Sequence, residues 1–243
     1  MLMDISKWIL YNPKIVRDHT SKKFYGRYLY RLIVFCPAGR AVDSKRSVVD
    51  ELEHRRVLSV NIKGWWGERL AKNIDKADPE FLERMKALRH QRLPNIKMRI
   101  EEPRLQLYAN SEEELTTIID TYFSPKDHVY IENITGPEDD TSKNLLDSGA
   151  IIRKKNLGYS HKVVLRDGKY SKDVKDSILN YLNSLGPEMV KIPNGFLTML
   201  TKSSSYMWNG YFYTNDPSVT TFIALISPGL VSNIHELVVV ADK

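Results

Sequence analysis

The side chains best suited to chemistry in this sequence are basic and aromatic, and they form two groups. The first group lies in residues 63–99, where Trp65 and Trp66 stand between two glycines and a basic segment follows. Guanidinium groups can form paired hydrogen bonds with phosphates, and aromatic rings can stack on unpaired bases. The pattern predicts a nucleic-acid contact surface; the alternative is an amphipathic surface helix with solvated charges and tryptophans that anchor it in the core. The basic candidates for phosphate contact are Arg84, Lys86, Arg89, Arg92, Lys97 and Arg99.

The second group is the aromatic segment 206–213, which we expect to lie on a strand. Gly210, Tyr211 and Tyr213 resemble the RNP1 pattern of RNA-recognition motifs, in which a glycine precedes two aromatic residues that stack on bases. Because strand side chains alternate, Tyr211 and Tyr213 should lie on the face opposite that of Tyr206, Trp208 and Phe212. The face with Tyr211 and Tyr213 could stack bases, cover another domain or form a subunit interface.

Signatures of catalysis and of metal binding are weak. The six histidines show no metal-ligand spacing, and the single cysteine, Cys36, lies in an apolar run typical of a buried strand. Glu51 precedes His54 by three residues and could share a helix face with it, but such pairs are common in helices without catalytic function. No phosphate-binding loop, nucleophile elbow or metalloprotease motif is present. We therefore expect no metal or other cofactor, and the sequence favours a protein without catalytic activity of its own.

Charge is distributed unevenly along the 243 residues. Residues 1–104 hold 23 Lys and Arg against 13 Asp and Glu, a balance of +10, whereas residues 105–243 have a balance of −4. A basic half is typical of a chain that meets an anionic partner such as nucleic acid, although basic residues can also merely solvate long helices. No apolar run reaches the roughly 20 residues of a membrane span. With one cysteine as well, we expect an intracellular protein in a reducing compartment, with no membrane partner.

The clearest element pattern covers residues 159–243. A strand at 161–166 precedes a helix capped by Ser171 and ended by Gly186, and a strand at 188–192 leads into an irregular stretch. The strand 206–214 then precedes a second helix, and the run 234–240 is dense enough in β-branched residues for a strand buried on both faces. The apolar stripes predicted to face the core include Val174, Ile178, Tyr181, Leu182, Leu185, Val219, Phe222, Ile223 and Ile226.

Residues 26–135 repeat this pattern more loosely. We expect strands at 28–36, 56–62 and 128–134, a helix near 43–54 with Val48, Val49 and Leu52 inward, and a helical insertion at 63–95. Leu107-Tyr108-Ala109-Asn110-Ser111 and its following helix match Phe212-Tyr213-Thr214-Asn215-Asp216 and the helix after it. A similar segment at the same place in two element orders indicates an internal repeat.

The sequence therefore predicts an α+β protein with two ferredoxin-like (βαββαβ) units in tandem, the N-terminal one with a helical insertion. The predicted boundaries are an N-terminal arm 1–25, a unit 26–135 that contains the basic insertion 63–95, a connector 136–158, and a second unit 159–243.

Three functions fit these expectations. The favoured one is a nucleic-acid-binding accessory protein that contacts RNA or single-stranded DNA phosphates through its basic half. The alternative is a structural or assembly subunit, of a virus particle or another large complex, in which the aromatic residues are interface anchors. The third rests on resemblance: tandem ferredoxin-like halves of this length resemble the CRISPR-associated repeat-processing proteins, which implies a metal-independent endoribonuclease. Those proteins carry a glycine-rich loop where this chain has Ser227-Pro228-Gly229, with one glycine.

Overall fold

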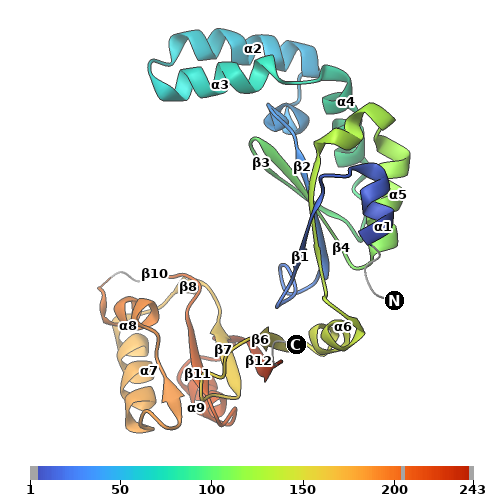
Figure 1. Ribbon diagram of the computed structural model, residues 1–243. Coiled ribbons are helices and arrows are strands. Elements are labelled where there is room, and N and C mark those ends of the chain that lie inside the picture. Colours follow the sequence, from blue (N-terminus) through green and yellow to red (C-terminus); the bar gives the residue numbers. More distant parts are fainter. Residues whose placement is uncertain (1–4, 204–205, 241–243) are drawn as a thin grey trace. The chain divides into compact units, whose positions relative to one another are not determined.

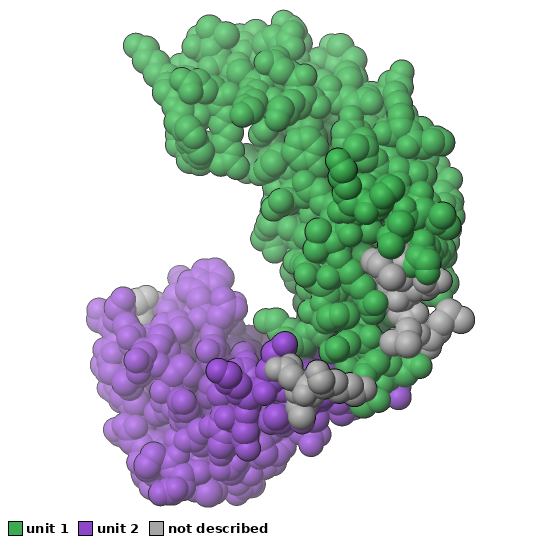
Figure 2. All heavy atoms as spheres, in the orientation of Figure 1, with its two compact units in different colours: residues 1–143 green, residues 144–243 purple. Residues whose placement is uncertain are grey.

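The protein is a mixed α+β chain that forms two compact units (Figure 1). The computed structural model describes residues 5–203 and 206–240. Unit 1 comprises Met1–Lys143 and unit 2 comprises Asn144–Lys243, coloured separately in Figure 2. The division falls inside one helix of the segment 136–158.

Unit 1 begins with a helix and an edge strand and then builds a sheet around a block of helices. Its 3₁₀ turns are Gly39–Asp43 and Pro125–Tyr130. Its helices and strands are α1 (Ile5–Tyr11), β1 (Val16–His19), β2 (Tyr30–Phe35), α2 (Val48–Asn61), α3 (Trp65–Asp75), α4 (Pro79–Gln91), β3 (Lys97–Glu101), β4 (Arg104–Ala109), α5 (Glu112–Tyr122) and β5 (Ile131–Gly136).

Unit 2 follows the same general order. The helix α6 (Asp140–Asp147) spans the division between the units. The elements that follow it are β6 (Ile151–Arg153), β7 (His161–Leu165), β8 (Gly168–Lys169), α7 (Lys172–Ser184), β9 (Val190–Lys191), α8 (Asn194–Thr201), β10 (Tyr206–Met207), β11 (Tyr211–Thr214), α9 (Val219–Ile226) and β12 (Val231–Val239).

Each unit contains a mixed sheet of five strands. The strand order is β1-β5-β2-β4-β3 in unit 1 and β6-β12-β7-β11-β9 in unit 2. In both sheets the first strand of this order pairs in parallel with its neighbour, and every other pairing is antiparallel. The two sheets therefore have the same order and the same strand directions, position by position.

Local capping explains where several helices begin. The Asp78 carboxylate accepts hydrogen bonds from the amides of Glu80 and Phe81 at the start of α4. Ser111 and Glu114 form a reciprocal capping box at α5. Ser171 caps α7, and Gly186 follows that helix with φ +77°, a conformation in which glycine has no steric penalty. The start at Ser171 and the stop at Gly186 agree with the sequence pattern.

The core of each unit lies on one face of its sheet. In unit 2 a continuous cluster joins strands β7 and β11 to helices α7, α8 and α9 through Val163, Ile178, Phe196, Phe212 and Ile223. In unit 1, α1 and α5 lie along one side of the sheet (Figure 1). The fully buried side chains there include Trp8, Leu32, Val34, Leu105, Leu107, Leu115 and Ile119.

The sequence predicted a strand at 56–62, and this prediction is wrong. Residues 56–61 form the second half of α2. Ser47 caps that helix by accepting from the Asp50 amide, and the helix then continues through Val57 and Val60, whose β-branching only weakly opposes it. The strand expected at 56–62 is instead β3, which directly precedes β4 and forms a hairpin with it. The predicted inward position of Val49 is also wrong, because its side chain is exposed.

Several expectations for unit 2 need correction. The stretch after Pro193 forms α8, and the strand predicted at 206–214 is interrupted at Asn209, whose φ is +50°. This break ends the alternation that would have placed Trp208 with Phe212: Phe212 is buried and Trp208 is exposed. β12 is not buried on both faces, since Ile234 and Val239 are exposed.

Phe222 is 46 % exposed rather than buried and lies 4.1 Å from the Tyr181 ring, centroid to centroid. At the chain start, the described part of the predicted arm contributes α1 and β1, and β1 pairs with β5. The predicted connector likewise contains α6 and β6. Residues 1–4 of the arm and 241–243 of the second unit lie outside the described residues.

No helix within the described ranges has both the length and the hydropathy needed to cross a lipid bilayer.

Candidate functional site

The face of each sheet opposite its core, here called the outer face, carries the candidate site. Because strand side chains alternate, the buried positions of Val163 and Phe212 direct their neighbours Lys162, Tyr211 and Tyr213 to the outer face of unit 2. The same alternation directs Arg31 and Tyr108 to the outer face of unit 1.

In unit 2, Tyr213 lies between two lysines on adjacent strands. Its register partner is Lys162 on β7 and Lys191 on β9. The Lys162 ammonium lies 3.9 Å from the centroid of the Tyr211 ring, and Tyr159 stacks on Tyr213 with centroids 6.3 Å apart. We call Lys162, Tyr213 and Lys191 the tyrosine row of unit 2.

In unit 1, Tyr108 has an equivalent position. Its register partner is Arg31 on β2 and Lys97 on β3, and these three residues are the tyrosine row of unit 1. One more strand continues each row: Thr135 on β5 lies opposite Arg31, and His235 on β12 lies opposite Lys162. Arg31 also donates to the Thr135 hydroxyl at 3.1 Å.

The two rows differ in how much of the tyrosine is exposed. Tyr213 is half-buried, whereas Tyr108 is buried beneath residues of the segment before β2. Tyr25 covers Tyr108 edge-on with centroids 5.0 Å apart and is itself exposed. The Lys97 ammonium lies 4.0 Å from the Tyr25 centroid, and Arg99 donates to the Tyr25 hydroxyl at 2.8 Å. Tyr25 therefore gives unit 1 an exposed aromatic ring with two cations beside it.

The phenol groups respond to these surroundings. Burial, which raises the pKa of a phenol, is outweighed at Tyr25 by hydrogen bonds with Arg99 and Tyr108 and by the charges of Arg99 and Lys97, so that its pKa is lowered below 10. Burial, together with Tyr25, raises the pKa of Tyr108 to about 12. Burial and the neighbouring Tyr211 raise the pKa of Tyr213. The tyrosines of both rows are thus neutral near pH 7, and their basic neighbours are not countered by phenolates.

Three of the other predicted basic residues, all on α4, are engaged inside unit 1. Arg84 donates to the fully buried carboxylate of Asp127 at 2.7 Å. Arg89 bonds Asp43 at 2.9 Å and the Met98 carbonyl at 2.8 Å. Lys86 donates to a backbone carbonyl, that of Arg46. The contacts of these three side chains tie α4 to its neighbours.

Three further predicted residues lie apart from these contacts. Arg92 is exposed where α4 ends, with φ +48°. Trp65 and Trp66 are exposed on α3, so they do not anchor the insertion in the core. Of the predicted residues, the structure brings together Lys97 and Arg99 around Tyr25, and Tyr211 and Tyr213 beside Lys162.

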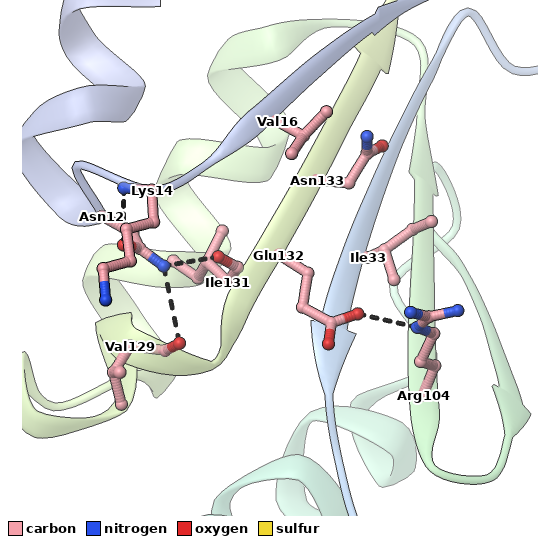
Figure 3. A pocket seen from close by; sticks show the side chains of 9 residues that line it. All are labelled: Asn12, Lys14, Val16, Ile33, Arg104, Val129, Ile131, Glu132 and Asn133. Atoms are coloured by element: carbon pink, nitrogen blue, oxygen red, sulfur yellow. Dashed lines mark hydrogen bonds and ion pairs between the residues drawn. The ribbon is translucent and has the colours of Figure 1, made fainter.

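A pocket of about 460 Å³ hollows the outer face of unit 1 beside its tyrosine row (Figure 3). Ile33 and Asn133 line it, and this register pair lies two residues along the strands from Arg31 and Thr135. Across the pocket, the Glu132 carboxylate points to Arg104 and pairs with it at 2.7 Å (Figure 3). Because Glu132 neutralises Arg104, this pocket offers less positive charge to a ligand than the tyrosine row does.

Among residues 5–203 and 206–240, no group of three or more His, Cys, Asp and Glu side chains is placed to hold a metal ion.

Sequence reasoning missed Tyr25, Arg31, Tyr108, Lys162 and Lys191. The sequence repeat already aligned Tyr108 with Tyr213, and this alignment was the available signal for an equivalent site in the two units. The cross-strand register that places the cations beside each tyrosine could not be obtained from the sequence.

Comparison with known proteins adds no further information: no family model matches the chain, and neither the curated proteins nor the solved structures include a significant match.

Proposed function

We propose that this chain is a nucleic-acid-binding accessory protein made of two ferredoxin-like units, each extended by a parallel edge strand, and that it binds RNA or single-stranded DNA on their outer faces. The strand orders β5-β2-β4-β3 and β12-β7-β11-β9 are those expected for βαββαβ units.

The observation that carries the proposal is the repetition of the tyrosine row. In each sheet a tyrosine lies between basic residues on the two neighbouring strands: Tyr108 on β4 between β2 and β3, and Tyr213 on β11 between β7 and β9. Adjacent strands are about 4.8 Å apart, so each cation lies within reach of the edge of the ring. A base stacked on an aromatic ring would then have its flanking phosphates close to positive charge.

The position of the aromatic residues also supports single-stranded nucleic acid as the ligand. RNA-recognition motifs place stacking aromatics on a central strand of a sheet of this kind. Tyr211 and Tyr213 lie on β11, between β7 and β9, and both are half-buried rather than fully covered. In unit 1 the exposed ring is Tyr25, which lies over Tyr108.

The test is fluorescence anisotropy with labelled oligouridylate and oligothymidylate on the full chain. The double variant Lys162→Ala/Lys191→Ala should bind both oligonucleotides more weakly. Its slope of log K against log salt should flatten by about 0.7 for each phosphate of a single strand that the variant no longer neutralises.

The matched control is Lys169→Ala/Lys202→Ala, which removes two exposed lysines of unit 2 outside the row. It carries the same net charge as the test variant, so any difference between the two reflects position rather than charge. Equal affinities for the two variants would rule out the row as the binding site. A parent chain that binds neither oligonucleotide at low salt would refute the proposed function.

A further inference from the structure

The hairpin of α2 and α3 is an addition to the pattern that the two units share. It stands between β2 and β3, where unit 2 has the single helix α7. The two helices lie side by side (Figure 1) and approach closely at Gly67, where an added Cβ would lie 1.9 Å from the Ile62 carbonyl oxygen. This hairpin contributes nothing to either tyrosine row, so its surface requires a separate explanation.

The hairpin exposes several large apolar side chains. Val60 is 81 % exposed, Trp66 67 % and Trp65 59 %. Leu58 and Ile62 are also exposed. A cluster of large apolar side chains in water is typical of an interaction surface.

A groove runs between α3 and the turn of the β3–β4 hairpin. Its volume is about 700 Å³, and Ile62, Trp66, Leu70 and Ile100 form its apolar lining. A neighbouring pocket shares Leu70 with this groove and extends the apolar lining to Leu58. The apolar strip is therefore continuous from α2 across α3.

The charged groups of the groove are not balanced. Its carboxylates have partners within the unit: Glu102 pairs with Arg55 at 2.8 Å, and Glu101 with Arg99. Its two cations, Arg40 and Arg69, form no ion pair among the described residues. The Arg69 guanidinium instead lies 5.0 Å from the Trp65 ring centroid, a cation–π contact that leaves its charge uncompensated.

We infer that this groove binds an acidic amphipathic segment of a partner protein. Its two uncompensated cations complement carboxylates, and its apolar strip complements a row of large aliphatic or aromatic side chains. Aliphatic side chains such as Leu70 and Ile100 neither stack on bases nor bond to phosphates, which disfavours nucleic acid as the occupant. The concave wall formed by the β3–β4 turn fits a peptide segment better than a flat bilayer surface.

The test is selection of a random peptide library displayed on phage against the full chain. The enriched peptides should combine Asp or Glu with large apolar residues. One of them, synthesised with a fluorescent label, should bind the parent chain and lose about tenfold or more in affinity for Arg40→Glu/Arg69→Glu. A second variant, Trp66→Ala, should weaken the same peptide without a change in net charge.

The matched control is Lys63→Glu/Lys72→Glu, which reverses two exposed charges of the same hairpin outside the groove. It should bind the peptide like the parent chain. Circular dichroism and thermal unfolding of each variant show whether the fold is kept, and peptide binding is compared among folded variants only. Trp66→Ala and the charge reversal test the groove independently, so one folded variant is sufficient.

Three outcomes would overturn the inference. They are the absence of groove-dependent enrichment, enriched peptides that bind Arg40→Glu/Arg69→Glu as well as the parent chain, and a groove variant that loses oligouridylate or anionic vesicle binding instead of peptide binding. Since the groove variants leave both tyrosine rows intact, unchanged oligonucleotide binding by them separates this inference from the proposed function.

Discussion

Tyr108 and Tyr213 occupy the same register position in the two sheets of this protein, each with a basic residue opposite it on both neighbouring strands. Their sequence surroundings also match, from the preceding hydrophobic residue to the Asn that follows two positions later. The repeat is therefore visible both along the chain and across the strands. It extends beyond the backbone to a charged and aromatic surface that the core does not require.

Substitutions at buried and at half-exposed apolar positions of the unit 2 helices should differ in their effect on the free energy of unfolding. Ile178 is fully buried, so Ile178→Ala should lower the free energy of unfolding by about 2–5 kcal/mol. Phe222→Ala should cost less, about 1 kcal/mol, because this residue is 46 % exposed and its ring contacts that of Tyr181. Denaturant unfolding of the full chain measures both. Equal losses would mean that α9 faces the core differently.

The arginines of α4 should affect stability rather than ligand binding. Arg84→Ala leaves the fully buried Asp127 carboxylate without its ion pair and should cost about 2 kcal/mol. Arg92→Ala, at an exposed position, should stay within about 0.5 kcal/mol of the parent. The comparison uses unfolding in urea. A triple substitution of Arg84, Arg89 and Arg92, which would report on phosphate binding if all three were solvated, is therefore confounded by a loss of stability.

Acid should weaken the start of α4. Burial raises the pKa of Asp78, but hydrogen bonds from the Phe81 and Glu80 amides and the charge of Lys126 outweigh it, so the pKa is lowered from 3.8. A carboxyl group whose pKa is lower in the folded state contributes stability above its unfolded pKa and loses it as the pH falls through the folded value. Asp78→Ala should cost about 1 kcal/mol at neutral pH.

The control for this acid effect is Asp78→Asn, which keeps a capping oxygen without the charge. Its stability should change less than that of the parent between pH 5 and the acid limit of folding, in thermal unfolding followed by circular dichroism. A parent and an Asn variant with the same pH dependence would show that the Asp78 charge contributes nothing.

Gly67 should be essential to the α2–α3 hairpin. An added Cβ would lie 1.9 Å from the Ile62 carbonyl oxygen and 2.7 Å from that of Ser59, both backbone atoms that cannot rotate away. Gly67→Ala should therefore cost about 1–3 kcal/mol or separate the two helices. Gly195→Ala, with open space at its Cβ, is the matched control in α8. Amide hydrogen exchange of α3 measures the change, and unaltered protection would contradict the close approach.

Local signals predicted much of the fold. The Ser171 cap and the Gly186 stop bound α7 where the sequence predicts, and Ile178 and Leu182 line its buried face as their spacing predicts. The segment 56–62 was mispredicted because β-branched residues favour strands only weakly, and packing of α2 against α3 overrides that preference.

The candidate site was harder to predict than the helices. The sequence indicates a solvated Arg84, because its partner Asp127 lies 43 residues away and no periodic pattern connects the two. The cations beside Tyr108 and Tyr213 come from other strands, and their positions depend on a register set by the complete sheet. Tyr25 reaches Tyr108 through a turn in which its φ is +54°, a conformation that the sequence does not predict for a tyrosine.

The most direct test of the account is the affinity of four proteins for labelled oligouridylate: the parent chain, Tyr25→Ala, Tyr213→Ala and the double variant. Each ring that stacks on a base should contribute about 1–3 kcal/mol, so each single variant should bind about 5-fold or more weakly and the double variant more weakly than either. Tyr25→Phe and Tyr213→Phe, which keep the ring, should bind like the parent. A double alanine variant with the affinity of the parent chain would contradict the central claim that the outer faces bind single-stranded nucleic acid through Tyr25 and Tyr213.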